Sequence, residues 1–161
     1  MKLKPSYVGV DPGKNGGIAV ICFGRVIGVT TMILSEKKTL DLTSIAEWII
    51  SVTSGTIPVA CIEKVGAMPG QGVTSMFSFG FSTGAIHGIF AALGIPRHVV
   101  SPQTWKKIVL ANTPKDKEAA IDFCRRVYPY ISLLPTKNCK KSHSGMADAI
   151  CIARYALEHI V

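Results

Sequence analysis

The sequence lacks the features that mark a secreted, disulfide-stabilised or multidomain protein. Its five cysteines are odd in number and form no CxxC pair, so we expect reduced thiols in an intracellular protein. No repeat, linker or low-complexity tract divides the chain, and residues 1–5 lead straight into the first predicted strand, so we expect no signal peptide. A length of 161 residues with 48% hydrophobic side chains therefore predicts one domain, residues 1–161, in the cytoplasm.

The sequence also lacks charge over a long internal stretch, since no Lys, Arg, Asp or Glu occurs between Lys64 and Arg97. Residues 68–72 (Met-Pro-Gly-Gln-Gly) read as a loop and polar side chains interrupt the rest, so we expect no membrane span and predict a helix over about residues 74–93. Small residues at four-residue spacing on this helix indicate a neighbour packed closely against it, either in the core or in a homodimer. They include Gly80, Gly84 and Gly88.

Acidic side chains are scarce, with 10 Asp and Glu against 18 Lys and Arg, and the resulting charge of +8 is unevenly placed. Residues 1–96 carry 7 basic and 5 acidic side chains, a net of +2, whereas residues 97–161 carry 11 and 5, a net of +6. We therefore expect the C-terminal part to face a polyanion such as a nucleic acid.

Three of the few acids, Asp11, Glu63 and Asp148, end or interrupt strongly apolar runs. An Asp before Pro-Gly is also a common turn residue, and a Glu before Lys could be an ordinary charge at a strand end. The helix around Asp148, however, is apolar on nearly every side, and the nearest basic neighbour in sequence, Arg154, falls off its face. An ionised carboxylate in apolar surroundings is costly unless it is paired, neutralised or bound to a metal. Together the three acids predict a divalent-cation site.

Local patterns predict an α/β domain with a mixed sheet and flanking helices. The first two strands form a hairpin, because the segment between them is rich in Gly, Pro and Asn. Ser101-Pro102 and Thr113-Pro114 each resemble an N-cap followed by proline at the first helical position. The predicted strands are 6–11, 17–23, 25–33, 58–63 and 97–100, and the predicted helices are about 41–53, 74–93, 102–110, 114–127 and the segment after 144.

Lysines cluster at the expected starts of two helices. Lys106 and Lys107 follow Ser101-Pro102, and Lys115 and Lys117 follow Thr113-Pro114. A cation in a first helical turn opposes the helix dipole, whereas a phosphate bound there would reverse the sign. Each lysine could equally be an ordinary solvated charge.

Four sequence blocks carry most of the acids and lysines discussed above: VGVDPG (8–13), CIEK (61–64), SPQTWKK (101–107) and GMADA (145–149). Together they resemble the signature motifs of RuvC-type Holliday junction resolvases. They follow the family's order and approximate spacing over nearly the whole chain, and the loop at 68–72 is most similar to the phage and organellar branch. The resemblance implies a ribonuclease H-like fold with a mixed five-stranded sheet, a homodimer, Mg²⁺ or Mn²⁺ dependence without a small-molecule cofactor, and paired symmetric nicks in four-way junction DNA.

The resemblance also implies roles for single residues. Asp11 would bridge two metal ions, with Glu63 on one and Asp148 on the other, and two such ions together can activate a water and stabilise the leaving oxygen of a phosphodiester. Lys106 matches a lysine of the family's site, and Lys117 matches a second one that lines its DNA cleft. Further DNA contacts are expected from Lys107 and, as an alternative to a plain loop and helix-start role, from Gln71, Thr74, Ser75 and Phe77.

One position departs from the family pattern. Many members carry a fourth acid or a histidine three residues before the last aspartate, where this chain has Gly145. The nearest candidates are His143 and Ser144, and His143 could bind metal, relay a proton or lie in solvent. Either the loop brings His143 into the site or the enzyme works with three acids. A junction-binding protein without activity is the remaining option.

Two functions outside this family are also compatible with parts of the sequence. Another ribonuclease H-like nuclease, acting on branched DNA or RNA–DNA hybrids, would use the same acids. An Asp-containing hairpin also begins the actin-like phosphotransferases, but those need a second phosphate-binding hairpin and a larger chain.

Overall fold

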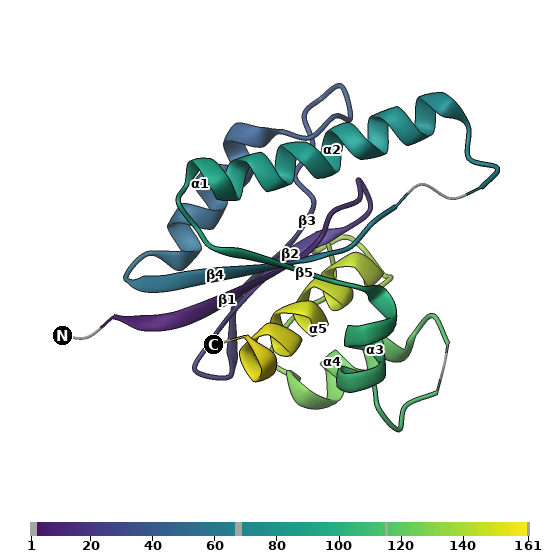
Figure 1. Cartoon of the computed structure of the whole chain (residues 1–161). Helices are drawn as coiled ribbons and strands as arrows, with labels where there is room; N and C mark the ends of the chain where they lie inside the picture. The colour runs from purple at the N-terminus through teal and green to yellow at the C-terminus, as the bar shows by residue number, and fades with distance from the viewer. Residues whose placement is uncertain (1–2, 67–68, 115, 161) are drawn as a thin grey trace.

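The computed structural model describes residues 3–66, 69–114 and 116–160, and its strands form a mixed sheet between two helical layers (Figure 1). The strand order is β3-β2-β1-β4-β5; β1 pairs antiparallel with β2 and parallel with β4, which pairs parallel with β5. The predicted mixed five-stranded sheet and its N-terminal hairpin are therefore confirmed. The strands are β1 (Lys4–Asp11), β2 (Gly17–Cys22), β3 (Arg25–Thr31), β4 (Thr56–Glu63) and β5 (Arg97–Val100).

The helices are α1 (Leu42–Thr53), α2 (Val73–Ala92), α3 (Pro102–Val109), α4 (Ala119–Val127) and α5 (Ser144–His159). They cover both faces of the sheet, α1 and α2 on one face and α3, α4 and α5 on the other (Figure 1). Strand side chains alternate between two cores, as the pleat requires. Val8 and Val10 of β1 pack toward α1 and α2, whereas Ala19 and Ile21 of β2 pack toward α5.

Helix α5 lies on β1 and on the β1–β2 turn with backbone against backbone. A Cβ at Gly9 would overlap the carbonyl oxygen of Ala149 and the amide nitrogen of Ala153, and a Cβ at Gly145 would overlap the carbonyl oxygen of Asn15. Residues with a side chain cannot make so close an approach. The hairpin and the first turns of α5 are thus held together, and each carries one of the predicted acids.

Helix α2 packs on the opposite face only along its C-terminal half. Ile86, Ile89 and Phe90 are buried there, whereas Phe77 and Phe81 in the N-terminal half are 76% and 67% exposed. Half of this helix is therefore a surface element in a single copy of the chain.

The glycines of α2 face open space. Apart from the helix itself, no atom in the described residues lies within 4 Å of a Cβ built on Gly80, Gly84 or Gly88. The prediction that they admit a close neighbour in the core is wrong, and their contact with a second copy stays a prediction. In the described ranges no helix is long and apolar enough to cross a membrane.

Helix α4 begins later than predicted. We expected Thr113 and Pro114 to open it, but its first residue is Ala119. The Thr113 hydroxyl instead donates a hydrogen bond to the carbonyl oxygen of Leu110 (2.8 Å), just after α3. Thr113 therefore finishes one helix and does not start the next, because its side chain has a backbone acceptor on its N-terminal side.

Candidate active site

Two of the three predicted acids end neighbouring parallel strands. Asp11 is the last residue of β1 and Glu63 the last of β4, and the register pairs Val10 with Ile62 immediately before them. Both carboxylates therefore lie at the same edge of the sheet, where the carboxyl ends of parallel strands meet. The glycine contacts between α5 and the hairpin bring Asp148 to this edge.

The three acids act on one another electrostatically. The pKa of Asp11 is raised to about 7, first by burial and then by the charges of Glu63 and Asp148, while a hydrogen bond from the Gly13 backbone and the charge of Lys106 oppose the rise. Burial raises the pKa of Asp148 to about 6, against a lowering by Lys106 and with a further rise from Glu63. The structure thus gathers the predicted acids into one group, the carboxylate cluster (Asp11, Glu63 and Asp148). Like charges that are partly withdrawn from water are typical of functional sites.

The carboxylate cluster has donors suited to a divalent cation. The ion pairs in the described part of the chain lie within α4 and within α5 and involve other acids. Carboxylate oxygens with uncompensated charge are the ligands that Mg²⁺ and Mn²⁺ prefer. As the side chains stand, the described residues contain no group of three or more His, Cys, Asp or Glu arranged to hold a metal ion. The cluster fits a metal by its chemistry, and rotation of its side chains would be needed to bring them onto shared ions.

Glu63 has a partner that the sequence reasoning missed. The indole Nε1 of Trp105, in α3, donates to Glu63 Oε2 at 2.6 Å, and Trp105 is fully buried. Ser101 and Pro102 open α3 as predicted, with Ser101 Oγ accepting from the Thr104 amide at 3.1 Å. The sequence signal that could have pointed to this contact was Trp105, which lies in the helix that begins directly after β5. The pairing of β5 with β4 places the start of that helix near Glu63.

A groove next to Asp148 is lined by lysines from α3 and from the connection to α4. They are Lys106, Lys107 and Lys117, and Ser144 at the start of α5 lies in the same groove. The predicted DNA-facing lysines that the structure describes are therefore brought together with one acid of the cluster.

The helix-dipole argument is wrong for Lys106 and Lys107. Helix α3 has only 8 residues, so Lys106 and Lys107 fall in its last turn, where a cation is favourable. Lys117 precedes α4, and Lys115 lies outside the described residues. The case for phosphate binding rests on the position of the lysines in the groove and not on an unfavourable dipole.

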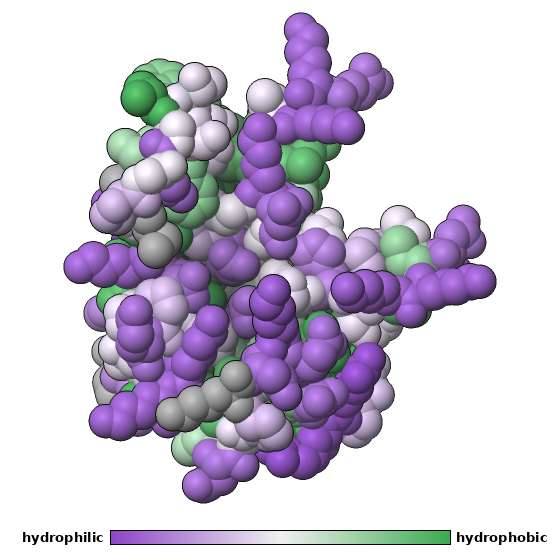
Figure 2. Space-filling model, turned by 90° about the vertical axis from the view of Figure 1, so that its right-hand side faces the viewer, coloured by the Kyte–Doolittle hydropathy of each residue, from purple (hydrophilic) through white to green (hydrophobic). Residues whose placement is uncertain are grey.

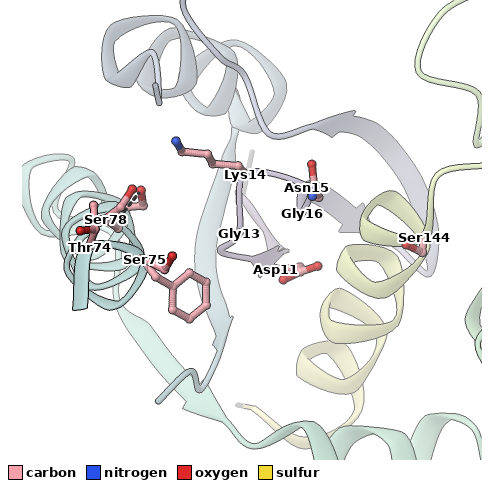
Figure 3. A pocket seen from close by; sticks show the side chains of 11 residues that line it. Asp11, Gly13, Lys14, Asn15, Gly16, Thr74, Ser75, Ser78 and Ser144 are labelled. Carbon is pink, nitrogen blue, oxygen red and sulfur yellow. Dashed lines mark hydrogen bonds between the residues drawn. The ribbon is translucent and has the colours of Figure 1, made fainter. Parts of the chain in front are cut away.

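A second cavity has Asp11 in its lining (Figure 3). The turn between β1 and β2 contributes Lys14 and Asn15, which the sequence reasoning did not select. The facing surface of α2 contributes a row of hydroxyl side chains, Thr74, Ser75, Ser78 and Ser82.

Only some of the DNA contacts predicted in residues 71–77 line this cavity. Thr74 and Ser75 line it, whereas Gln71 and Phe77 lie outside its lining, and Met68 is outside the described residues. Ser144 lines both this cavity and the lysine groove, so the two hollows adjoin there, with Asp11 in the lining of the first and Asp148 in the lining of the second.

His143 and Gly145 both have structural explanations. His143 is the N-cap of α5, with Nδ1 accepting from the Met146 amide at 3.3 Å, and burial lowers the pKa of its imidazole. A nitrogen that accepts carries no proton, so the cap needs the neutral ring. Gly145 is buried against Asn15 and Gly16, which leaves no room for the side chain of a fourth acid. A chemical role for His143 stays a prediction.

The surface around these grooves is polar. Hydrophilic side chains dominate the face seen from the right-hand side of Figure 1, and apolar side chains appear there in small separate patches (Figure 2). With a net charge of +8 for the chain, such a surface suits a polyanionic ligand.

Comparisons with known proteins identify the fold. No protein-family model matches the sequence, and no curated protein matches it significantly. Thermus thermophilus RuvC in complex with a Holliday junction substrate matches with a TM-score of 0.66 at 17% identity over 95% of both chains. Another Thermus thermophilus RuvC structure gives 0.62 at 16% over 95% of both chains. The yeast mitochondrial Holliday junction resolvase Ydc2 gives 0.54 at 14%, over 99% of this chain and 83% of that one. The predicted ribonuclease H-like fold, in the form that RuvC has, is confirmed.

Proposed function

We propose that this chain is a divalent-metal-dependent endonuclease that resolves four-way DNA junctions by paired nicks, as a RuvC-type resolvase. The observation that carries the proposal is the carboxylate cluster, in which half-buried acids repel one another at one edge of a RuvC-like fold. The Thermus thermophilus protein with this fold is described in complex with a Holliday junction substrate. The proposal covers residues 1–161 as one intracellular nuclease domain.

Asp11, Glu63 and Asp148 would hold the Mg²⁺ or Mn²⁺ ions, with Asp11 between the other two. Such ions supply an activated water and stabilise the leaving oxygen in phosphodiester hydrolysis. The surroundings of Asp11 and Asp148 shift the pKa of each carboxyl group before any metal ion binds. With its pKa raised to about 7, Asp11 holds a proton more readily than an ordinary aspartate and has to release it to act as a ligand. Lys106 favours the ionised form of Asp148.

The two adjoining hollows form a candidate DNA path. The lysine groove offers point charges to phosphates, and release of counterions would then drive binding. The cavity between the hairpin and α2 offers Lys14 and a row of hydroxyls, which are suited to phosphate and sugar oxygens. A backbone strand crossing from one hollow to the other would pass over Asp11.

Paired nicks require two active sites, so we propose a homodimer. The exposed half of α2 is the surface best suited to it, because the open faces of Gly80, Gly84 and Gly88 allow a second helix to approach closely and Phe77 and Phe81 offer apolar area. Light scattering on the junction complex measures the stoichiometry, and one chain for each junction would contradict the dimer.

The direct test of the activity is cleavage of matched DNAs that differ only in branching. With Mg²⁺, the protein should cut a four-way junction at symmetric positions and should cut three-way, flap and linear duplex DNAs far more slowly. Preferential cleavage of an RNA–DNA hybrid or a flap would assign a different ribonuclease H-like activity. Binding without cleavage in Mg²⁺ or Mn²⁺ would identify a junction-binding protein.

Substitutions in the cluster separate cutting from binding. Asp11→Asn, Glu63→Gln and Asp148→Asn should each abolish single-turnover cleavage and leave metal-free junction binding intact, because they remove metal ligands and not phosphate contacts. Asp122→Asn is the matched control, since Asp122 is an exposed carboxylate paired with Arg125 on α4. It should cut like the wild type, and an equal loss of binding and cutting in the cluster variants would contradict the assignment.

A further inference from the structure

The start of α3 is fixed next to the end of β4. Strand β5 pairs in parallel with β4, its last residue Val100 lies opposite Glu63, and the Lys64 amide donates to the Val100 carbonyl oxygen at 2.7 Å. The next residue, Ser101, caps α3, and Pro102 occupies its first turn. A capped helix that opens with proline has little freedom to shift. The fourth residue of this helix, Trp105, is therefore placed within reach of the Glu63 carboxylate.

Trp105 is anchored on its apolar side and polar only at one atom. Its side chain is fully buried in the core formed with Val100, Val109 and the inner face of α5. The indole N–H is a donor without acceptor capacity, and a buried tryptophan needs a partner for it. That partner is Glu63 Oε2 at 2.6 Å, a short distance typical of a hydrogen bond to a charged acceptor.

The contact restrains one oxygen of Glu63 and leaves the other available. Glu63 ends β4 on a long, flexible side chain, and no ion pair in the described part of the chain holds it. The indole is rigid and fully buried, so the bond holds Oε2 from the protein interior. A carboxylate has two oxygens, so Oε1 remains for a ligand.

We propose that Trp105 is a positioning residue that orients Glu63 for metal binding, an inference that rests on the proposed function. Donors that hold a ligating carboxylate from behind are typically worth 10–100-fold in metal affinity or activity. The Nζ atom of Lys106, the next residue, lies 5.2 Å from the centroid of the Trp105 ring. The charge of Lys106 acts to lower the pKa of Asp148. The same turn of α3 therefore acts on two members of the carboxylate cluster, by a hydrogen bond on one and by charge on the other.

The test removes the N–H and keeps the ring. The sequence has 2 tryptophans, Trp48 and Trp105. In a Trp48→Phe background, replacing tryptophan with benzothienylalanine during expression changes position 105 alone, with sulfur in place of the N–H in a ring of nearly the same shape. Trp105→Phe is the second variant, and Trp48→Phe, on the opposite face of the sheet, is the matched control.

Mn²⁺ binding to the DNA-free protein is the readout, measured from the electron paramagnetic resonance signal of the free ion. We expect the benzothienylalanine protein to bind Mn²⁺ about 10-fold or more weakly than its Trp48→Phe parent, with the melting temperature of the metal-free protein unchanged within error. Equal Mn²⁺ affinity in the two proteins would overturn the proposal. So would weak binding by Trp105→Phe together with normal binding by the benzothienylalanine protein, because ring packing would then be responsible.

A double-substitution cycle shows whether Trp105 acts through Glu63. In a Glu63→Gln background, loss of the N–H should change Mn²⁺ affinity by less than about twofold, since the oriented ligand is already gone. An undiminished 10-fold effect would overturn the proposal. These measurements use no DNA, so failure of the junction-cleavage test with an intact Mn²⁺ effect would reject the proposed substrate and leave the role of Trp105 standing.

Discussion

The two helical layers are attached to the same sheet in different ways (Figure 1). On one face α5 meets the hairpin backbone to backbone at Gly9 and Gly145. On the other face α2 turns Gly84 and its neighbouring glycines to open space, and Phe81 stays 67% exposed. Glycines therefore have two different structural roles in this chain. Gly9 and Gly145 allow backbone atoms to come into close contact within the fold, whereas Gly84 lies on an exposed face of α2.

The two faces of the sheet therefore contribute differently to the proposed function. The α5 side fixes Asp148 relative to Asp11, so the relative position of the acids is built into the fold of a single chain. The α2 side contributes hydroxyls to the second cavity and an open surface for a second copy, which is the arrangement we propose. Substitutions should accordingly damage folding and the site on the first face and affect mainly binding and assembly on the second.

Of the substitutions that test this difference, Gly9→Ala should reduce the stability of the fold most. The new methyl group would overlap the backbone of Ala149 and Ala153, and backbone cannot rotate away as a side chain does. We expect a loss of about 3 kcal/mol or more in the free energy of unfolding, at the upper end for overpacking. Urea denaturation measures it, and a loss below about 1 kcal/mol would show that α5 can move away from the sheet.

A smaller loss is expected when the missing acid of the family pattern is supplied. Gly145→Asp places a side chain against the carbonyl oxygen of Asn15, in a turn that can yield more than a strand can. We expect destabilisation by about 2 kcal/mol and no gain in junction cleavage. Cleavage faster than in the wild type would mean that the turn opens to admit a fourth acid.

The pH dependence of stability reports on the cluster. A folded pKa of about 7 for Asp11, above its unfolded value of 3.8, means that the folded protein binds the proton more tightly. The resulting stabilisation is complete below pH 4 and is lost as the pH rises through 7, by at most about 1.4 kcal/mol per pH unit. Asp11→Asn should flatten this slope in metal-free protein and raise stability at pH 8, by at most about 4 kcal/mol. Thermal or urea denaturation at several pH values measures both effects, and an unchanged slope would contradict the burial of Asp11.

The smallest change, with the opposite sign from Gly9→Ala, is expected for Gly84→Ala. No atom beyond the helix lies within 4 Å of the added methyl group in the described residues, so only the helix propensity changes. The dilute monomer should gain about 0.5–1 kcal/mol. Denaturation at low protein concentration checks the gain, and a loss would mean that something in the chain covers this face.

The sequence predicted those parts that depend on local pattern. Short apolar runs located the strands, and the acids at or within such runs, Asp11, Glu63 and Asp148, are the ones that the fold brings together. The Ser101-Pro102 cap was correct because its hydrogen bond reaches only as far as Thr104. Each of these signals lies within a few residues of the structure that it predicts.

What the sequence did not predict depends on distant contacts or on competing local ones. The bond between Trp105 and Glu63 joins residues 42 positions apart. Thr113 had two possible helices to cap, and its hydroxyl bonds to the earlier one. The close contacts of Gly9 and the open face of Gly84 look alike in sequence, since whether a glycine has a neighbour is decided by the path of the whole chain.

The central claim is that a carboxylate cluster in each of two copies cuts one junction in a coordinated way. Cleavage of a supercoiled plasmid with an extruded cruciform tests it most directly, because paired nicks within one complex give linear plasmid and single nicks give open circles. The account predicts linear product from the wild type with Mg²⁺ and no product from Asp148→Asn. Open circles as the main product, or cleavage that survives Asp148→Asn, would contradict it.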